Sequence, residues 1–363
     1  MTNGSRHEFE ALVSMSEAVG LDLSDKSATL VVVDAMGNIS GEGKIPLSGE
    51  SLRKAFGRRK ATRIAIEVGT HSPWVSRLLY ELGHEVIVAN ARQVKLLREN
   101  RRKNDREDAL ILARLARLDP ALLRPIRHRG PQAQADLALL RARDGTVRTR
   151  VLLINLVRGQ VKSLGGRIPT CSTGAFAARA EAYIPEELRP ALTPVLMLIA
   201  QLTQQIKESE KALERASRRY PEVELLRQIK GVGPLTALAF VLVIEEPQRF
   251  TRSRGVGAFV GLTTRQSQSG EQAPQLHITK AGDELLRRLL VQSAHYILGP
   301  FGPDCDLRRW GLKLAGDGDN TIRKHKAVIA VARKLAVLLH RLWVDGLVYE
   351  PLRLHPADVE VVA

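Results

Sequence analysis

The hydrophobic pattern of this chain changes character near residue 120, and this change limits the possible folds more than any other feature. Before that point, short apolar runs of strand length alternate with segments of helical spacing. After residue 130, apolar residues recur in steps of three, four and seven, which is typical of helices. The pattern predicts an α/β N-terminal part and a mainly helical remainder. A length of 363 residues suits about two to three domains.

The N-terminal part predicts a mixed sheet flanked by helices. Strand-like runs occupy 18–23, 28–45, 63–69 and 85–90, and Met36-Gly37-Asn38 predicts a hairpin turn within the second run. Helical spacing follows at 74–83, which stops at Gly83, and at 105–118, which stops before Pro120. We expect the order strand, hairpin, helix, strand, helix, strand, helix.

Residues 131–216 predict two long helices with a narrow apolar seam. The first seam repeats every seven residues, with one residue filling an intervening step: Leu140, Val147, Val151, Ile154 and Val161. The second alternates steps of three and four: Val195, Ile199, Leu202, Ile206 and Leu213. The simplest arrangement is an antiparallel, coiled-coil-like arm suited to spanning or dimerisation. The alternative is a helical layer on the first domain.

Residues 222–350 predict a mainly α domain that contains a glycine turn between two helices. The segment Ile229 to Ala237 resembles a helix-hairpin-helix motif, in which Lys230, Gly231 and Gly233 meet a nucleic-acid backbone at a helix N-terminus. The alternative is a tight turn without a ligand. The tail from Pro351 is expected to be loosely ordered.

Charge and cysteine content narrow the class of protein. The chain carries 55 Lys and Arg against 39 Asp and Glu, a net charge of +16, which favours a polyanionic partner such as nucleic acid. Aromatic residues make up only 4%, which argues against a wall of stacking platforms for single-stranded bases. Two cysteines far apart, Cys171 and Cys305, exclude a disulfide scaffold and fit a reducing cytoplasm. The longest apolar stretch, 237–244, is too short for a membrane span, and the first 20 residues do not resemble a signal peptide.

An acidic set is the strongest chemical signal. Asp22 and Glu67 end or follow strand-like runs, where α/β sheets usually place their sites, and Asp105 and Asp108 share one face of a helix. Hard divalent cations prefer carboxylate oxygens, and paired metals act on phosphoryl groups. Singly, each acid could equally be an ordinary strand-end or helix N-terminal residue. Their joint order favours a metal-dependent phosphoryl-transfer site.

Two further candidates accompany the acids. A basic run before the second acidic pair suits phosphate-backbone approach, although a solvated helix face is the alternative; it contains Arg92, Lys95, Arg98, Arg101, Arg102, Lys103 and Arg106. Ser269, next to Gly270 in a polar loop, is a candidate nucleophile. Arg265 and Lys280, on either side of it, are candidate nucleic-acid-binding residues. Turn serines are common, so the residues alone make this a weak signal.

The segments GLDLSDK, IAIEVGT, RRKNDREDALILARLA, LLRQIKGVGPLTA, RFTRSRGVGAFVGLTTRQSQSG and ITKAGDELLRRLL occur in this order. Together they resemble the DEDD transposases of bacterial insertion sequences, a family that includes the pilin-gene invertase. The resemblance covers roughly residues 18–345. Two differences stand out: Asp25 takes the place of a usual lysine, with Lys26 following, and Glu67-Val68-Gly69-Thr70 replaces Glu-Ala-Thr/Ser-Gly.

The resemblance implies a RuvC-like, RNase H-fold domain and a C-terminal transposase domain with a catalytic serine. The acidic tetrad falls on Asp22, Glu67, Asp105 and Asp108, and the serine on Ser269. Mg²⁺, or alternatively Mn²⁺, is the implied cofactor. The implied partners are donor and target double-stranded DNA and a structured bridge RNA. We expect a homo-oligomer, dimer or tetramer, in the bacterial cytoplasm at the nucleoid and away from membranes.

The expected domains are 1–17 as an N-terminal extension, 18–125 as the catalytic domain, 126–218 as the arm, 219–348 as the transposase domain and 349–363 as a tail. The leading hypothesis is a recombinase that cleaves and exchanges strands through the serine. One alternative is a metal-dependent junction nuclease that uses water. The other is a nucleic-acid-binding protein without enzymatic activity.

Overall fold

The computed structural model describes residues 17–90, 104–265, 276–316 and 320–353. The chain divides into two compact units, Met1–Arg129 and Gly130–Ala363. In the parts of the chain that the model describes, no helix has both the length and the apolarity needed to cross a membrane.

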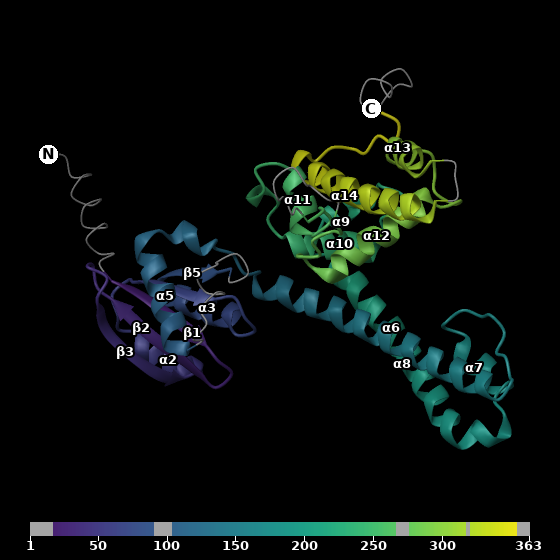
Figure 1. The fold of residues 1–363 in the computed structure, drawn as a ribbon, viewed down its shortest axis with the longest axis horizontal. Coiled ribbons are helices and arrows are strands. Elements are labelled where there is room, and N and C mark those ends of the chain that lie inside the picture. Colours follow the sequence, from purple (N-terminus) through teal and green to yellow (C-terminus); the bar gives the residue numbers. More distant parts are fainter. Residues whose placement is uncertain (1–16, 91–103, 266–275, 317–319, 354–363) are drawn as a thin grey trace. The chain divides into compact units, whose positions relative to one another are not determined.

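The first unit is a mixed sheet with helices on both faces (Figure 1). Its elements are, in chain order, β1 (Ala18–Leu23), β2 (Ser27–Val33), β3 (Ile39–Pro46), α2 (Gly49–Phe56), β4 (Arg63–Glu67), α3 (Ser72–Glu81), β5 (Glu85–Ala89) and α5 (Asp105–Leu118). The strand order is β3-β2-β1-β4-β5, in which β1, β4 and β5 are parallel and the hairpin strands are antiparallel. The predicted mixed sheet is confirmed, and its topology is compatible with an RNase H-like domain.

Strand alternation gives the sheet two apolar faces. One face buries Ala18, Ala65 and Ile87 against α5. The opposite face buries Val19, Ile64 and Val86 against α2 and α3. Because side chains alternate along a strand, every second residue of β1 and β4 points toward α5.

Helix α5 approaches β1 so closely that Gly20 has no room for a side chain. A Cβ atom at this position would lie 1.8 Å from the Ala109 carbonyl oxygen and 2.7 Å from the Ala113 nitrogen. These are backbone atoms of a helix, which cannot move aside independently. Glycine therefore sets the distance between α5 and the central strand.

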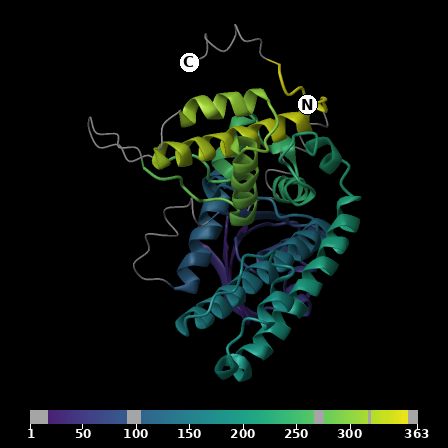
Figure 2. The ribbon, with the colours of Figure 1, turned by 90° about the vertical axis from the view of Figure 1, so that its right-hand side faces the viewer.

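The second unit is helical. Its elements are α6 (Pro131–Ser163), α7 (Phe176–Glu181), α8 (Arg189–Ser217), α9 (Glu222–Leu226), α10 (Pro234–Ile244), α11 (Arg254–Phe259), α12 (Glu284–Leu298), α13 (Asp306–Ala315) and α14 (Thr321–Asp345). The core surrounds α10, which is buried from Thr236 to Ile244. Helix α13 lies along α14 (Figure 2).

Helices α6 and α8 run side by side as two long helices, as predicted (Figure 1). Their apolar contacts form two separate clusters. Leu140 and Leu213 belong to the core around α10, whereas Ile154, Val161 and Ile199 form a distal core with α7. The placement of Val151 in the seam was wrong: its exposed fraction is 40%, and Val157, fully buried, takes that role. The reason is the 3.6-residue helical period, which carries the seam around the helix between the two cores.

A buried carboxylate joins the start of α6 to the end of α8. Asp136 accepts hydrogen bonds from Arg219 at 2.5 Å and Tyr220 at 2.7 Å. Burial, with help from Asp136, raises the pKa of Tyr220 to about 12, so its hydroxyl remains a donor. Burial raises the pKa of Asp136, but the hydrogen bonds from Tyr220, Arg219 and Gln132 outweigh it and the net shift is downward.

This arrangement predicts a pH dependence of stability. Because the pKa of Asp136 in the folded state lies below the usual 3.8, its stabilisation is complete above that pH and is lost as pH falls through the folded-state pKa. Asp136→Asn should lower the unfolding free energy by roughly 1–3 kcal/mol at pH 7. The unfolding free energy of this variant should also fall less steeply than that of the wild type as the pH drops below ~4. Urea titrations between pH 3 and 7 measure both. The control is Asp345→Asn, because Asp345 forms only an exposed ion pair, with Arg341. This variant should lose less than about 1 kcal/mol of unfolding free energy. An unchanged acid slope in Asp136→Asn would contradict this account.

The packing at Gly20 predicts that Gly20→Ala destabilises the first unit by at least about 2 kcal/mol, because the added Cβ overlaps the α5 backbone. Gly43→Ala is the matched control, since its nearest neighbour would be Leu30 Cδ2 at 4.0 Å. We expect the control to change stability by less than about 0.5 kcal/mol. Hydrogen exchange of β1 and α5 peptides under increasing urea measures both variants. Equal protection in the two variants would disprove the close-packing argument.

Candidate active site

The four predicted carboxylates lie together at the carboxyl ends of β1 and β4. They line one pocket of ≈ 450 Å³, whose other lining residues come from the loops after these two strands. The lining residues are Asp22, Leu23, Ser24, Asp25, Glu67, Val68, Gly69, Thr70, His71, Asp105 and Asp108.

Strand register explains the first two acids. Leu21 pairs with Ile66 in the parallel β1–β4 ladder, so Asp22 and Glu67 are the next residues on adjacent strands. Asp22 is two residues beyond Gly20, and Glu67 is two residues beyond Ala65, so both acids share the α5 face of the sheet.

The beginning of α5 supplies the other two acids. Asn104 caps this helix, and its side chain accepts a hydrogen bond from the Arg106 amide at 3.1 Å. Asp105 is exposed, whereas Asp108 is buried with an exposed fraction of 6%. Both carboxylates lie in the first turn of α5, where the positive end of the helix dipole favours acidic side chains.

The donor set fits a hard divalent cation, since all four predicted ligands are carboxylates. Among the described residues, however, no three His, Cys, Asp or Glu side chains are close enough to hold a metal ion together. The four acids thus share a pocket rather than a tight, preformed cluster.

The loop that follows Glu67 is held by Ser72. Its hydroxyl accepts from the Gly69 amide at 2.9 Å, lies 2.8 Å from the Gly69 carbonyl oxygen and 2.8 Å from His128 Nε2. Burial, followed by the charges of Arg77 and Arg129, lowers the pKa of His128, so this ring is neutral near pH 7.

The sequence analysis missed His71, which also lines the pocket. Its Nδ1 accepts a hydrogen bond from Trp74 Nε1 at 3.2 Å, and its Nε2 lies 3.5 Å from Asp25 Oδ1. The available signal was its position: residues directly after a parallel strand line the carboxyl edge of the sheet.

The described residues include only part of the predicted nucleic-acid-binding set. Arg92, Lys95, Arg98, Arg101, Arg102 and Lys103 lie outside the described residues. Arg106 forms ion pairs with Glu42 at 2.8 Å and Glu107 at 3.4 Å.

Ser269 also lies outside the described residues, but the two segments that flank 266–275 are paired. The Arg265 amide donates to the His277 carbonyl at 2.9 Å, and Thr264 bridges Ile278. Arg265 and Lys280 are both exposed on this short ladder. Lys280 has a left-handed backbone, with φ of 53°.

The glycine turn at 230–233 has two different glycines. Gly231, with φ of 98°, packs against α12, where a Cβ would lie 2.9 Å from Tyr296 Cδ1. Gly233 is the N-cap of α10 and has open space around its Cα. Lys230 is exposed beside them. A close helix–helix turn therefore accounts for Gly231, and Gly233 is the residue that leaves a helix N-terminus accessible.

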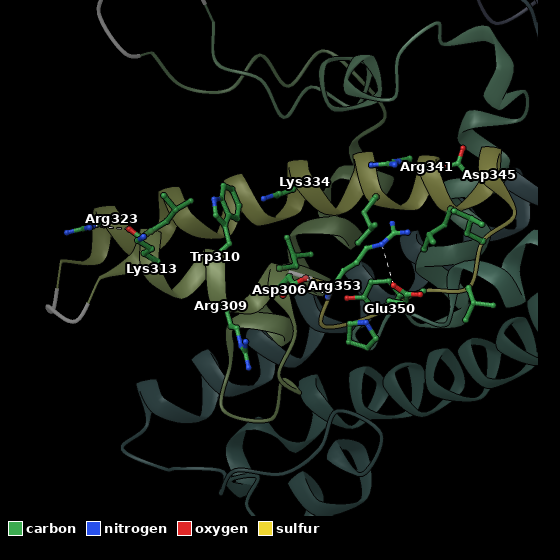
Figure 3. Close-up of a pocket in the computed structure, with 18 residues that line it drawn as sticks. Asp306, Arg309, Trp310, Lys313, Arg323, Lys334, Arg341, Asp345, Glu350 and Arg353 are labelled. Carbon is green, nitrogen blue, oxygen red and sulfur yellow. Dashed lines mark hydrogen bonds and ion pairs between the residues drawn. The ribbon is translucent and has the colours of Figure 1, made fainter. Parts of the chain in front are cut away.

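A larger cavity of ≈ 760 Å³ lies between α13, α14 and the segment that follows α14 (Figure 3). Trp310 and Lys334 meet at its centre, with Nζ 4.1 Å from the ring centroid. Its rim arginines form ion pairs, among them Arg341 with Asp345 at 3.5 Å and Arg353 with Glu350 at 3.3 Å. Half of its lining residues are charged, and the other half are apolar or aromatic, mostly leucine. Cations outnumber carboxylates in this lining, in contrast to the first pocket.

Two family models match separate regions of the chain. A family model described as "Transposase" matches residues 19–165, which include the four carboxylates. The model of the transposase IS116/IS110/IS902 family matches residues 223–303, which include the glycine turn and Ser269.

Relatives match across both units. The transposase for insertion sequence element IS1328 of Yersinia enterocolitica is 30% identical over 296 residues, 76% of this chain and 82% of that protein. The transposase for element IS1111A of Coxiella burnetii is 29% identical over 250 residues, 66% of each chain. A probable family 20 transposase of Pseudomonas aeruginosa is 26% identical over 300 residues, 80% and 87% of the two chains. This chain therefore belongs to the IS116/IS110/IS902 family of transposases, the enzymes that move insertion sequences by DNA strand transfer.

Proposed function

We propose that this transposase cleaves and exchanges DNA strands with a divalent metal site formed by Asp22, Glu67, Asp105 and Asp108. The observation that carries the proposal is that three separate elements, β1, β4 and α5, direct four carboxylates into one pocket. An RNase H-like architecture for residues 18–125 is part of the proposal. The strand order and the placement of α5 on one sheet face support it.

The family implies a divalent cation, and these carboxylates are the residues that would hold it; we propose Mg²⁺, with Mn²⁺ as the alternative. When bound, such ions stabilise negative charge on the attacking and leaving oxygens at phosphorus. Asp108, buried at the helix start, supplies a fixed ligand, whereas exposed Asp105 can reorient as DNA enters. Glu67 ends β4, directly before the loop that Ser72 braces.

Ser269 is the proposed nucleophile. Its hydroxyl oxygen attacks a DNA phosphate and forms a serine–phosphate ester, while the broken phosphodiester bond releases a free hydroxyl on the departing strand. The support is its place in the matched family region, between exposed Arg265 and Lys280. We further propose that Arg98, Arg101, Arg102, Lys103 and Lys230, with the backbone at Gly231 and Gly233, contact nucleic-acid phosphates.

The serine and the carboxylates belong to different units, so a catalytic centre needs both. We propose that the arm of α6 and α8 mediates formation of a dimer or tetramer in which one subunit's serine works with another's carboxylates. The net charge of +16 supports binding of both DNA and a structured guide RNA. A junction nuclease that uses water at the same carboxylates is the alternative enzyme.

The metal site predicts a specific loss of cation binding. Asp108→Asn should reduce Mn²⁺ affinity at least about tenfold, measured by calorimetry on the full chain, because it removes a buried charged ligand. Glu107→Gln is the matched control: it lies in the same helical turn but does not line the pocket. We expect the control to retain wild-type affinity. Equal Mn²⁺ affinity in all three proteins would exclude the proposed metal site.

The nucleophile is tested by Ser269→Ala, with Ser267→Ala as the neighbouring control. The proteins are expressed with the native flanking DNA, which supplies any guide RNA, and without it. We expect Ser269→Ala to abolish strand cleavage and the covalent protein–DNA product, and Ser267→Ala to retain both. Without the flanks, exchange should be lost if a guide RNA is needed.

The junction nuclease predicts the opposite result, namely cleavage by Ser269→Ala at the wild-type rate. In the same assay, a mixture of Ser269→Ala and Asp105→Ala proteins should recover activity if the two groups act from different subunits. No recovery would argue against a shared site between subunits.

A further inference from the structure

We propose that His71 binds a non-bridging oxygen of the DNA phosphate at the carboxylate pocket, through an Nε2–H group that Trp74 holds in place. This inference rests on the proposed function, because it assumes that a phosphodiester enters this pocket. It assigns a substrate-binding role to a residue that the acidic tetrad and the serine do not include.

Trp74 determines which nitrogen of His71 can donate. The indole Nε1–H lies 3.2 Å from His71 Nδ1. An indole N–H can only donate, so Nδ1 must accept, and the proton of the imidazole lies on Nε2. The two rings meet edge to face, at 88° and 6.3 Å between centroids, which fixes the plane of the imidazole.

The donor nitrogen lies on the pocket side of the loop. His71 lines the pocket together with the four carboxylates, and Nε2 is 3.5 Å from Asp25 Oδ1. This separation is longer than a good hydrogen bond, and the Asp25 side chain is 89% exposed. Asp25 therefore orients the ring weakly, and an incoming phosphate oxygen can replace it.

The electrostatics of the pocket favour such a donor. Five carboxylates line it, and His71 has the only nitrogen-containing side chain among the described lining residues. A phosphodiester that approaches these acids is repelled unless cations and hydrogen-bond donors compensate. A neutral N–H donor compensates without competing with the carboxylates for a metal ion.

The position of His71 in the chain strengthens the argument. It is the N-cap residue of α3, a helix of 10 residues, yet its side chain makes no capping hydrogen bond. The ring is thus not used to cap the helix, and the positive end of the helix dipole favours an anion at the same place. The serine brace between Ser72 and Gly69 keeps this turn rigid.

The test uses element-end DNA whose cleaved phosphate has been mapped with the wild-type protein. That phosphate is then replaced by each of the two phosphorothioate diastereomers. His71→Phe should slow cleavage of unmodified DNA about 10- to 100-fold, the effect of losing one hydrogen bond to a charged group. For one diastereomer, the wild-type protein should cleave the phosphorothioate more slowly than the unmodified DNA. His71→Phe should cleave both at the same rate, because its contact with that oxygen is already lost.

Two further variants separate hydrogen bonding from folding. His71→Gln retains an N–H donor and should recover part of the rate, with part of the sulfur effect. Trp74→Phe keeps an aromatic edge but lacks the indole donor, so it should give an intermediate rate. Mn²⁺ affinity should stay at the wild-type value in all three variants.

Wild-type cleavage rates in His71→Phe, an unaltered sulfur effect, or loss of Mn²⁺ binding would each overturn the proposal. Failure of the underlying function is distinguishable, since Asp108→Asn would then cleave this DNA as fast as the wild type.

Discussion

The close contact between α5 and the central strand β1 is the constraint on which the candidate site depends. Gly20 lets the backbone of α5 touch the sheet, with Ala109 and Ala113 at the contact. Small residues at these points allow the first turn of the helix to lie beside the carboxyl ends of β1 and β4. A helix held farther away by side chains would take Asp105 and Asp108 out of the pocket that Asp22 and Glu67 line. The grouping of the four carboxylates therefore depends on the absence of a side chain at Gly20.

The loop after β4 gives the pocket a second wall of a different kind. Ser72 uses its hydroxyl to tie the loop at Gly69 to His128, a residue 56 positions farther along the chain. The pocket thus combines a carboxylate side, built by β1, β4 and α5, with a donor side, built by the start of α3. The proposed function uses both: the carboxylates as metal ligands, and the donor to reduce repulsion between the acids and a phosphodiester.

Much of this could be predicted from local sequence. The strands, the hairpin and the limits of α5 follow from alternation, turn residues and the break at Pro120. The grouping of Asp22 with Glu67 follows from their equivalent positions at the ends of parallel strands. Local patterns did not reveal Val157 as a seam residue, because the distal core with α7 depends on contacts outside both helices. They also did not reveal His71, whose proposed role depends on the orientation of its ring by Trp74. The Ser72–His128 contact joins residues too distant in sequence for any periodicity to predict.

The second unit contributes differently from the first. Its core surrounds the uniformly apolar α10, and the exposed cations Arg265 and Lys280 stand on the ladder that flanks residues 266–275. Family membership spans both units, which is consistent with an enzyme whose metal ligands and nucleophile are carried separately. Under the proposed function, this separation would make the active centre conditional on assembly.

The central claim is that the four carboxylates bind one metal centre, and affinity cleavage tests it most directly. Fe²⁺ is added in place of Mg²⁺, ascorbate and peroxide generate radicals at the bound ion, and mass spectrometry maps the cuts in the polypeptide. The account predicts cuts near Asp22, near Glu67 and between Asp105 and Asp108, all suppressed by excess Mg²⁺. Cuts confined to other segments, or a pattern that Mg²⁺ does not suppress, would contradict it.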